Sequence, residues 1–324
     1  MRLLEGIHSY IERKQSAGLF FDVGARNLFA FSKYVGDVPL GVINQRHILT
    51  FLDGPQSSAI TWHSKYSILK NFFSYWIARR ELSGLPMPPK RAPAPPQTFV
   101  PYIYTRTELR RMLSATRSCQ RKSACKIDWK TLRAFLVFLY GTGALVGEAL
   151  RLLADDVDFK RRMVTIRGRR YERFRTIPIG PDLYQVLKTY HDARRRMKKV
   201  SPEFFVNKYG EPFNVNTLAV TFQRLRRTAG ISRTDGGPYQ PRLHDLRHTF
   251  AVHRLTAWYK HGADLNRMVP ALSAYIGQVG LASAERYLRL TPERFRAQLN
   301  TLSPRRGRKH WRDDPALMRF LADL

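Results

Sequence analysis

The chain has 324 residues, enough for two domains of ordinary size, and 44% of them are hydrophobic, as in globular proteins. Lysine and arginine number 56 against 25 acidic residues, so the formal net charge is +31. Such a charge destabilises a compact protein unless a polyanion neutralises it. Nucleic acid is the leading candidate partner, because each phosphate contact releases condensed counterions.

A membrane partner is not supported by the sequence. The most apolar run, residues 132–140, is too short to span a bilayer and contains Arg133. The N-terminal residues lack the pattern of a signal peptide. Cys119 and Cys125 lie six residues apart without a nearby cluster of metal ligands, so we expect two reduced thiols. These features together favour a cytoplasmic protein associated with the nucleoid.

The first predicted domain, residues 1–85, has the pattern of a helical domain. Lys65 and Lys70 lie off the apolar stripe of its clearest helix and are expected to face water or DNA. The stripe itself follows steps of four and three residues, which predicts core packing. It consists of Trp62, Tyr66, Leu69, Phe73 and Trp76.

A proline-rich linker is predicted at residues 86–101. Six prolines occur between Pro86 and Pro96, and such a stretch is extended and semi-rigid. A basic linker between two basic domains suits a protein that wraps around DNA, although basic residues also serve solubility alone. We expect the second domain to cover residues 102–303. Residues 304–324, the tail, are expected to form a basic spacer, with Arg305, Arg306, Arg308 and Lys309, followed by a C-terminal helix.

The second domain is predicted to be mainly helical with one small sheet. Thr105 and Glu108 form a capping-box pattern at its first helix, and a later apolar helix ends at Gly141-Thr142-Gly143. Short strands rich in β-branched residues are predicted at residues 157–159, 163–166 and 176–179. Further helices are predicted at residues 181–197, 215–228 and 244–258 and around residues 282–290. The fold class is therefore mainly α, with a helical domain followed by an α+β domain that holds a small antiparallel sheet.

One segment combines His244, Arg247 and His248 at spacings that a helix places on one side. Arginine is a permanently charged, planar donor that binds two phosphate oxygens at once. The neighbouring imidazoles can relay protons or donate to the same phosphate. The alternative interpretation is an ordinary helix start, with His244 near the cap and Arg247 paired with Asp245.

Downstream of this segment, Gln278 precedes Tyr287 by nine residues. Together with His244-x-x-Arg247-His248, this spacing resembles the C-terminal boxes of the tyrosine recombinases, or phage integrases. Residues 102–105, 140–150 and 166–179 also resemble family segments, so the likeness covers nearly the whole second domain. The first domain fits the family's core-binding domain by size and position rather than by motif.

The resemblance implies site-specific DNA recombination without a metal or other cofactor, moving or integrating a mobile element. Tyr287 would attack a DNA phosphate and form a 3′-phosphotyrosyl link. Arg247 matches the family's second phosphate-binding arginine, His244 matches the first residue of its box, and His248 supports the helix. Tyr275 is the rival tyrosine, but it precedes the box and is expected to pack.

Three family positions carry a different residue. Leu145 stands where the family has its first phosphate-binding arginine, Arg170 where it has a lysine, and Gln278 where it has histidine or tryptophan. These departures leave two hypotheses open: an active recombinase, or a catalytically impaired DNA-binding subunit that assists related recombinases at element ends. Arg151 and Arg133 are the candidates to replace the missing arginine.

Arginines crowd the expected turn between the second and third strands. Arg167, Arg169, Arg173 and Arg175 are predicted to contact DNA there, together with the catalytic candidate Arg170. The alternative is a solvated charged loop. A second basic run, residues 194–199, fits a solvated helix face equally well.

The tail ends in residues 315–324, which carry apolar side chains at helical spacing: Leu317, Phe320, Leu321 and Leu324. A short helix of this kind needs an apolar groove to bury its stripe. In the resembled family, C-terminal helices dock into a neighbouring protomer. We therefore expect a homo- or hetero-oligomer of recombinases on double-stranded DNA, with docking onto its own domain as the alternative.

Overall fold

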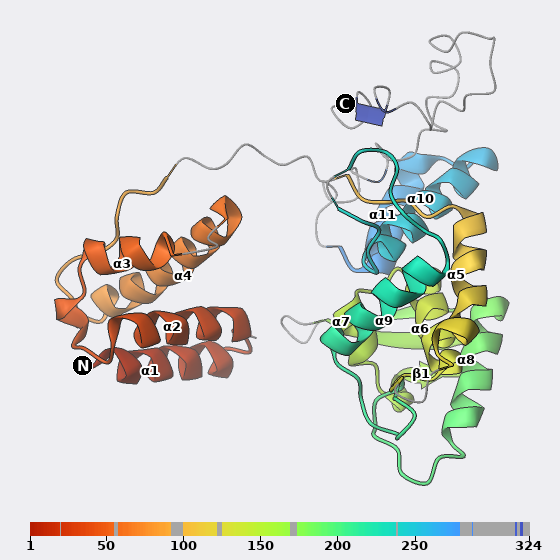
Figure 1. Cartoon of the computed structure of the whole chain (residues 1–324), viewed down its shortest axis with the longest axis horizontal. Helices are drawn as coiled ribbons and strands as arrows, with labels where there is room; N and C mark the ends of the chain where they lie inside the picture. The colour runs from red at the N-terminus through yellow and green to blue at the C-terminus, as the bar shows by residue number, and fades with distance from the viewer. Residues whose placement is uncertain are drawn as a thin grey trace. The chain divides into compact units, whose positions relative to one another are not determined.

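The computed structural model of the chain describes residues 1–19, 21–54, 58–91, 100–121, 125–168, 174–237 and 239–278, and residues 287, 315, 318 and 319. The chain divides into two compact units, with the boundary between Gln97 and Thr98 (Figure 1). Within the described ranges, no helix is both long and apolar enough to cross a membrane.

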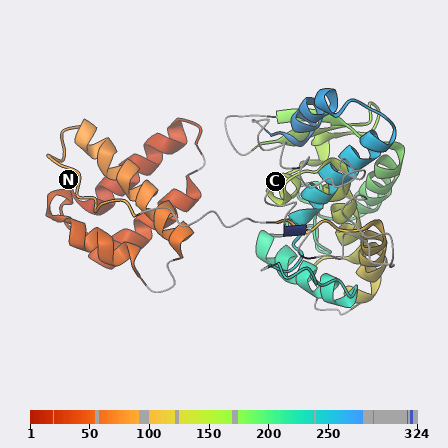
Figure 2. The ribbon, with the colours of Figure 1, turned by 90° about the horizontal axis from the view of Figure 1, so that it is seen from above.

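The first unit is a bundle of helices, drawn in red and orange in Figure 1 and seen from above in Figure 2. Its helices are α1 (Leu3–Ser16), α2 (Asp22–Val35), α3 (Gln45–Leu52) and α4 (Ala59–Ala78), with a 3₁₀ turn, η1 (Leu40–Val42). The apolar stripe predicted on α4 is confirmed, because all five of its side chains are buried in one core with residues of α1, α2 and α3. Met87 joins this core and Tyr66 donates a hydrogen bond to the Pro88 carbonyl, so the first residues of the predicted linker pack on this unit.

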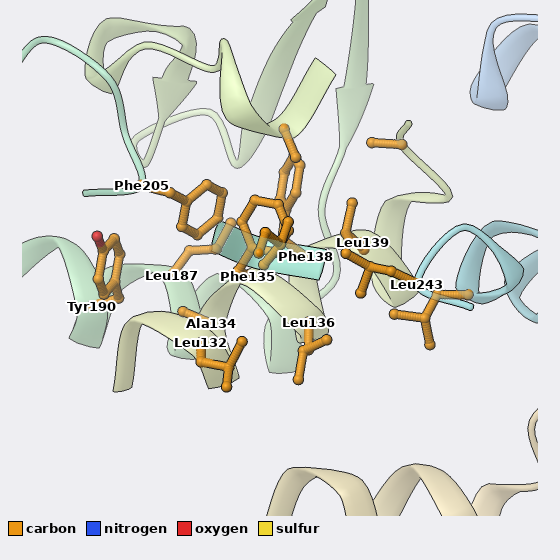
Figure 3. Close-up of a cluster of buried hydrophobic side chains, with 14 of the residues drawn as sticks. Leu132, Ala134, Phe135, Leu136, Phe138, Leu139, Leu187, Tyr190, Phe205 and Leu243 are labelled. Carbon is orange, nitrogen blue, oxygen red and sulfur yellow. The ribbon is translucent and has the colours of Figure 1, made fainter. Parts of the chain in front are cut away.

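The second unit is built around α6 (Trp129–Thr142). Its other helices are α5 (Arg106–Cys119), α7 (Val146–Leu150), α8 (Pro181–Arg194), α9 (Val215–Thr228), α10 (Asp245–Lys260) and α11 (Leu265–Ile276). Helix α6 contacts α5, α7, α8 and α10, so its apolar residues are enclosed from several sides. Figure 3 shows Leu132, Phe135 and Phe138 of α6 beside Leu187 and Phe205. Thr105 and Glu108 form the predicted capping box at the start of α5.

A three-stranded antiparallel sheet completes this unit, in the order β1 (Val157–Asp158), β2 (Met163–Arg167) and β3 (Phe174–Pro178), after a 3₁₀ turn, η2 (Ala154–Asp156). The predicted antiparallel sheet is therefore confirmed. Val164 pairs with Ile177 and both are buried, which places that face of the hairpin against the core. The sheet stands beside α7, which contacts β2.

Two features of the second unit differ from the sequence prediction. Strand β3 begins at Phe174, two residues earlier than predicted, so Arg175 lies within the strand and not in its turn. Directly paired residues of an antiparallel sheet point to the same face, and Arg175 pairs with Ile166, which is buried. Helix α11 was not predicted, and it contains Pro270, a residue that is uncommon in the interior of a helix.

Both cysteines are free, as predicted. Cys119 ends α5, and Cys125 lies beyond that helix; both side chains are buried. Arg224 of α9 donates a hydrogen bond to the Cys119 sulfur at 3.4 Å, so this thiol helps to hold α9 against α5.

Candidate active site

Arg247 is fixed in the first turn of α10, with only 6% of its surface exposed. Its Nη1 donates to the Gly143 carbonyl at 2.7 Å, which joins α10 to the end of α6. Burial lowers the pKa of Arg247 from its ordinary value, and the neighbouring Tyr287 and Glu148 oppose that shift. Arginine nevertheless keeps its charge in proteins, so this guanidinium is a buried cation held in one orientation.

The turn after α6 requires glycine at position 143. Gly143 has φ +63°, a left-handed conformation that a side chain disfavours. A Cβ there would also lie 2.7 Å from Phe250 of α10 and 3.0 Å from Ile276 of α11. The glycine therefore lets three helices approach one another at the point where its carbonyl receives Arg247.

Tyr287 is the predicted nucleophile, and the structure brings it to Gln278 and Arg247. The Gln278 Nε2 donates to the Tyr287 hydroxyl oxygen at 3.0 Å, and Arg247 is a further hydrogen-bonding partner of that oxygen. The Tyr287 side chain is buried, and its ring lies 5.6 Å from the His248 imidazole. Two donors thus converge on the Tyr287 oxygen.

His244 and His248 stand one turn apart at the start of α10, with ring centroids 5.4 Å apart. His244 occupies the N-cap position, as the helix-start interpretation expected. The His244 side chain is exposed, but desolvation by the groups packed around it lowers its pKa, the charges of Arg247 and Arg242 lower it further, and Asp245 opposes them. At neutral pH this imidazole is therefore uncharged and able to accept a proton. Asp245 pairs with Arg242, not with Arg247 as the alternative interpretation proposed.

Sequence reasoning missed the ion pair between Arg175 and Glu148. The Arg175 guanidinium binds both carboxylate oxygens of Glu148 at 2.9 Å, and its Nε donates to the Tyr275 carbonyl. The side chains are only 15% and 8% exposed. Burial alone would raise the pKa of Glu148, but the hydrogen bonds and charge of Arg175 outweigh it, and the pKa is lowered. Arg175 of β3 thus joins α7 to α11 beside the site, whereas it was predicted to lie among the arginines of the turn.

Leu145, matched by sequence to the family's first arginine, is the N-cap of α7 and 38% exposed. Its backbone N–H donates to Glu148 Oε2 at 2.8 Å, so position 145 lies beside the ion pair of Glu148 and Arg175. Of the two candidate replacements, Arg133 donates to the Leu113 carbonyl of α5. Arg151 folds back along α7, where its Nη1 reaches Gly147.

The described DNA-binding candidates belong to both units. Arg167 forms an ion pair with Asp156 at 2.7 Å, which ties β2 to η2, yet its side chain stays 59% exposed. Lys70 is exposed on α4, and the ammonium of Lys65 lies 4.7 Å from the centre of the Phe51 ring. The catalytic candidate Arg170 and the DNA-binding candidates Arg169 and Arg173 lie outside the described residues.

Tyr275 packs, as expected of the rival tyrosine. Its ring stacks on Phe250 with centroids 5.7 Å apart, and its hydroxyl donates to the Pro178 carbonyl at 3.1 Å. Burial raises the pKa of Tyr275, which disfavours the phenolate. Tyr275 therefore serves as an internal comparison for Tyr287 in the experiments below.

The assembled site holds a tyrosine hydroxyl, a buried arginine and an uncharged histidine. Arginine binds phosphate oxygens, the hydroxyl is a nucleophile once it loses its proton, and the imidazole accepts protons. This set suits covalent transfer of a phosphoryl group. Among the described residues, no group of three or more His, Cys, Asp or Glu side chains is placed to hold a metal ion.

Comparison with known proteins identifies the family of this site. Residues 104–294 match the model of the phage integrase family. The protein y4rB of Sinorhizobium fredii, whose name describes an integrase/recombinase, is 29% identical over 95% of this chain and 98% of its own length. The tyrosine recombinase XerC of Staphylococcus carnosus is 27% identical over 80% of this chain and 81% of its own length.

Solved structures share the fold. A lambda integrase dimer bound to a COC′ core site superposes with a TM-score of 0.60 and 19% identity, covering 87% of this chain and 96% of that one. The Tn1549 transposon integrase in complex with transposon right end DNA gives a TM-score of 0.63 and 18% identity, covering 91% of this chain and 100% of that one. Since the family model matches more than half of the residues, the chain belongs to the phage integrase family of tyrosine recombinases, whose activity is site-specific DNA recombination.

Proposed function

We propose that this protein cleaves and rejoins DNA through a covalent link to Tyr287, and so moves or integrates a mobile element. The observation that carries the proposal is the convergence of Gln278 and Arg247 on the Tyr287 oxygen. An ordinary core tyrosine needs no cation at its hydroxyl. The net charge of +31 supports DNA as the partner, in the cytoplasm and on the nucleoid.

In the proposed reaction, the Tyr287 oxygen attacks a backbone phosphorus, and the bond from phosphorus to the 5′-oxygen breaks. The 3′ end is then joined to the tyrosine, and the leaving 5′-oxygen takes up a proton. A 5′-hydroxyl from a partner strand reverses the step, so the bond energy is conserved and no nucleotide cofactor is required. Arg247 binds the phosphate, and uncharged His244 accepts or relays the proton.

Arg170 and His248 complete this assignment. Arg170 binds phosphate but is a poor proton donor, because an arginine stays charged. His248 packs one turn from His244 and beside the Tyr287 ring, and so supports both. Leu145 contributes no hydrogen bond or charge from its side chain to the phosphate.

The second candidate function is a DNA-binding subunit that leaves cleavage to a related recombinase. Leu145 is the observation that favours it, since the loss of one preorganised donor costs a rate factor on the order of a hundred or more. The two functions differ in one measurable property, because only the first produces a covalent protein–DNA adduct.

The test uses a nicked suicide substrate that carries the element's own end. The wild-type chain is expected to form an adduct that resists denaturation, Tyr287→Phe to form none, and Tyr275→Phe to form it at the wild-type rate. Tight binding to the same DNA without an adduct from the wild type would establish the second function instead. Leu145→Arg is the companion variant, with adduct formation expected to rise by about a hundredfold.

The proposed DNA surface combines the exposed Lys70 with Lys65 on α4 and the arginines around the β2–β3 turn. Arg167 is the last residue of β2, and Arg169, Arg170 and Arg173 follow it in the sequence before β3. Each phosphate contact that is removed lowers the slope of log affinity against log salt by about 0.9. Lys70→Glu is expected to weaken binding to all duplexes alike and to reduce this slope, which a salt titration of DNA affinity measures. An unchanged slope would remove Lys70 from the DNA surface.

We further propose that residues 315–324 dock into a neighbouring copy or a related recombinase on DNA. A groove between α5 and α6 offers a cavity of about 290 Å³ for an apolar stripe. The exposed Arg106 and Arg110 line its edge, where they can pair with Asp323 of the docking segment. The apolar lining includes Leu109, Met112, Leu113, Leu136 and Val137. The tail's acidic residues are Asp313, Asp314 and Asp323.

Deletion of residues 315–324 tests this docking by light scattering of the protein–DNA complex. The truncated chain is expected to bind as separate protomers, and Leu113→Glu in the groove is expected to show the same defect. Unchanged assembly together with lower thermal stability of the free protein would show that the tail docks onto its own domain.

A further inference from the structure

The entry segment that leads into the second unit, residues 100–105, is hydrogen-bonded directly to residues 242–249. This turn at the start of α10 carries His244 and Arg247. Tyr104, fully buried, donates its hydroxyl hydrogen bond to the Arg242 carbonyl at 3.0 Å. Its backbone N–H donates to the Thr249 hydroxyl at 3.0 Å. Tyr104 thus holds two points of the chain, 242 and 249, and His244 and Arg247 lie between them.

Residues 242–249 are also joined to one another by hydrogen bonds, which couple the positions of their backbone atoms. The backbone N–H and the guanidinium of Arg242 both donate to the buried Asp245 carboxylate, at 2.8 and 3.1 Å. Thr249 in turn donates its hydroxyl hydrogen bond to the Asp245 carbonyl at 2.8 Å. A displacement of the Arg242 carbonyl therefore carries the N-terminal turn of α10 with it, including His244.

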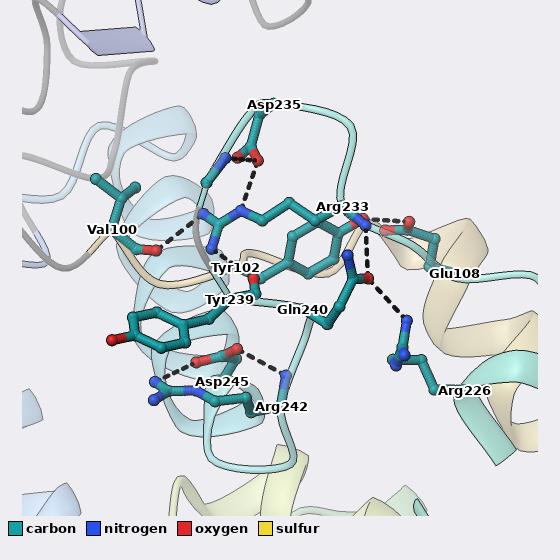
Figure 4. A network of polar contacts seen from close by, with 11 residues as sticks. Val100, Tyr102, Glu108, Arg226, Arg233, Asp235, Tyr239, Gln240, Arg242 and Asp245 are labelled. Carbon is teal, nitrogen blue, oxygen red and sulfur yellow. Dashed lines mark hydrogen bonds and ion pairs between the residues drawn. The ribbon is translucent and has the colours of Figure 1, made fainter. Parts of the chain in front are cut away.

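A second attachment of the entry segment lies just upstream of Tyr104, where Arg233 contacts Val100 (Figure 4). The Arg233 side chain, only 3% exposed, donates to the Val100 carbonyl at 2.8 Å and forms an ion pair with Asp235. Its other terminal nitrogen donates to the Tyr239 carbonyl. Tyr102 is bonded differently, because its hydroxyl donates to Glu108 at the start of α5. The entry segment therefore makes separate attachments, of which that of Tyr104 reaches the active-site turn.

The Tyr104 hydroxyl is not required to fill space, since phenylalanine fills the same core. Burial raises the pKa of Tyr104, so the group stays a neutral donor at physiological pH. A buried hydroxyl stabilises the fold only through its partner, and here that partner is the carbonyl two residues before His244. We propose that Tyr104 is a positioning residue for cleavage, which sets His244 and Arg247 against the phosphate. The inference rests on the proposed cleavage by Tyr287.

Tyr104→Phe tests the inference, with Tyr102→Phe as the matched control that also loses one hydroxyl. Loss of one hydrogen bond that orients the site is expected to slow adduct formation on the nicked substrate by about tenfold. DNA affinity is expected to stay within about twofold, since the change lies in orientation and not in phosphate contacts. Tyr102→Phe is expected to cleave at the wild-type rate. Equal rates for both variants and the wild type would overturn the inference.

A second measurement follows the His244 imidazole by NMR and needs no activity. The His244 side chain is exposed but packs near Arg247, Arg242, Asp245 and the His248 ring, and desolvation by this packing is the first cause of its lowered pKa. Release of the turn moves His244 away from these packed neighbours and from the charges of Arg247 and Arg242, so Tyr104→Phe is expected to raise the His244 pKa toward its ordinary value. Tyr102→Phe is expected to leave that pKa unchanged.

The two readouts separate failure of this inference from failure of the proposed function. If no form of the chain yields an adduct, the proposed cleavage fails, and the His244 titration still decides whether Tyr104 holds the turn. An identical His244 pKa in wild type, Tyr104→Phe and Tyr102→Phe would overturn the inference. Thr249→Val releases the same turn from its other side and is expected to reproduce both effects, whereas Thr249→Ser retains the hydroxyl and both wild-type values.

Discussion

Arg175→Met is expected to destabilise the second unit through Glu148. The substitution leaves the volume of the side chain largely in place but removes the partner of a carboxylate that is 8% exposed. Removal of one member of a buried ion pair costs about 3–5 kcal/mol, because the remaining charge stays buried without compensation. The Leu145 N–H continues to donate to Glu148 and offsets part of that cost, so we expect about 3 kcal/mol.

The pH dependence of this loss follows from the Glu148 pKa, which the ion pair lowers from an ordinary value of 4.5. A carboxyl group with a lowered folded-state pKa stabilises the fold fully above its unfolded pKa and loses that contribution as pH falls through the folded value. In Arg175→Met, burial without the arginine raises the Glu148 pKa instead, so Glu148 takes up a proton at a higher pH in the variant than in the wild type. The free-energy difference between wild type and Arg175→Met is therefore expected to shrink as pH falls from neutral toward the lowered wild-type pKa of Glu148.

Urea unfolding of the full chain at several pH values measures this difference, with amide hydrogen exchange in α7 to assign the transition to the second unit. The double variant Arg175→Met, Glu148→Leu is the control, since it removes both charges and is expected to recover most of the stability. A loss below about 1 kcal/mol at pH 7, or a loss that does not change with pH, would refute the assignment of a buried, charged pair.

Two further substitutions test the geometry of the site. Gly143→Ala is expected to lower the free energy of unfolding by about 2–4 kcal/mol, because it strains a left-handed residue and places Cβ against Phe250. A loss under about 1 kcal/mol in denaturant unfolding would contradict the tight packing of this turn. Gln278→Leu removes one of the donors to Tyr287 and is expected to slow adduct formation by at least about tenfold at unchanged DNA affinity. Wild-type kinetics in this variant would show that the amide plays no part at the hydroxyl.

Local sequence patterns were enough to predict much of the fold. The stripe on α4 was predictable because helical periodicity alone decides which of its side chains face a core. The capping box at Thr105 is likewise a signal contained in four residues. The spacing of Gln278 and Tyr287 predicted that they share a site, and their hydrogen bond agrees with that prediction.

Contacts between segments that lie far apart in the sequence could not be predicted from local patterns. Arg175 was placed in a basic turn because the predicted strand began too late, and a strand residue changes face according to its register. Its partner Glu148 lies 27 residues earlier in the sequence, a separation that helix or strand periodicity does not cover. The Tyr104 hydroxyl and the Arg242 carbonyl are separated by 138 residues, so only the folded chain reveals that contact.

The central claim is that Tyr287 becomes joined to DNA, and mass spectrometry of the covalent adduct tests it most directly. After proteolysis and nuclease digestion of the product from the suicide substrate, the account predicts one peptide that carries a 3′-linked nucleotide on Tyr287. A nucleotide on another residue, such as Tyr275, or no linked peptide from a chain that binds the same DNA tightly, would contradict it.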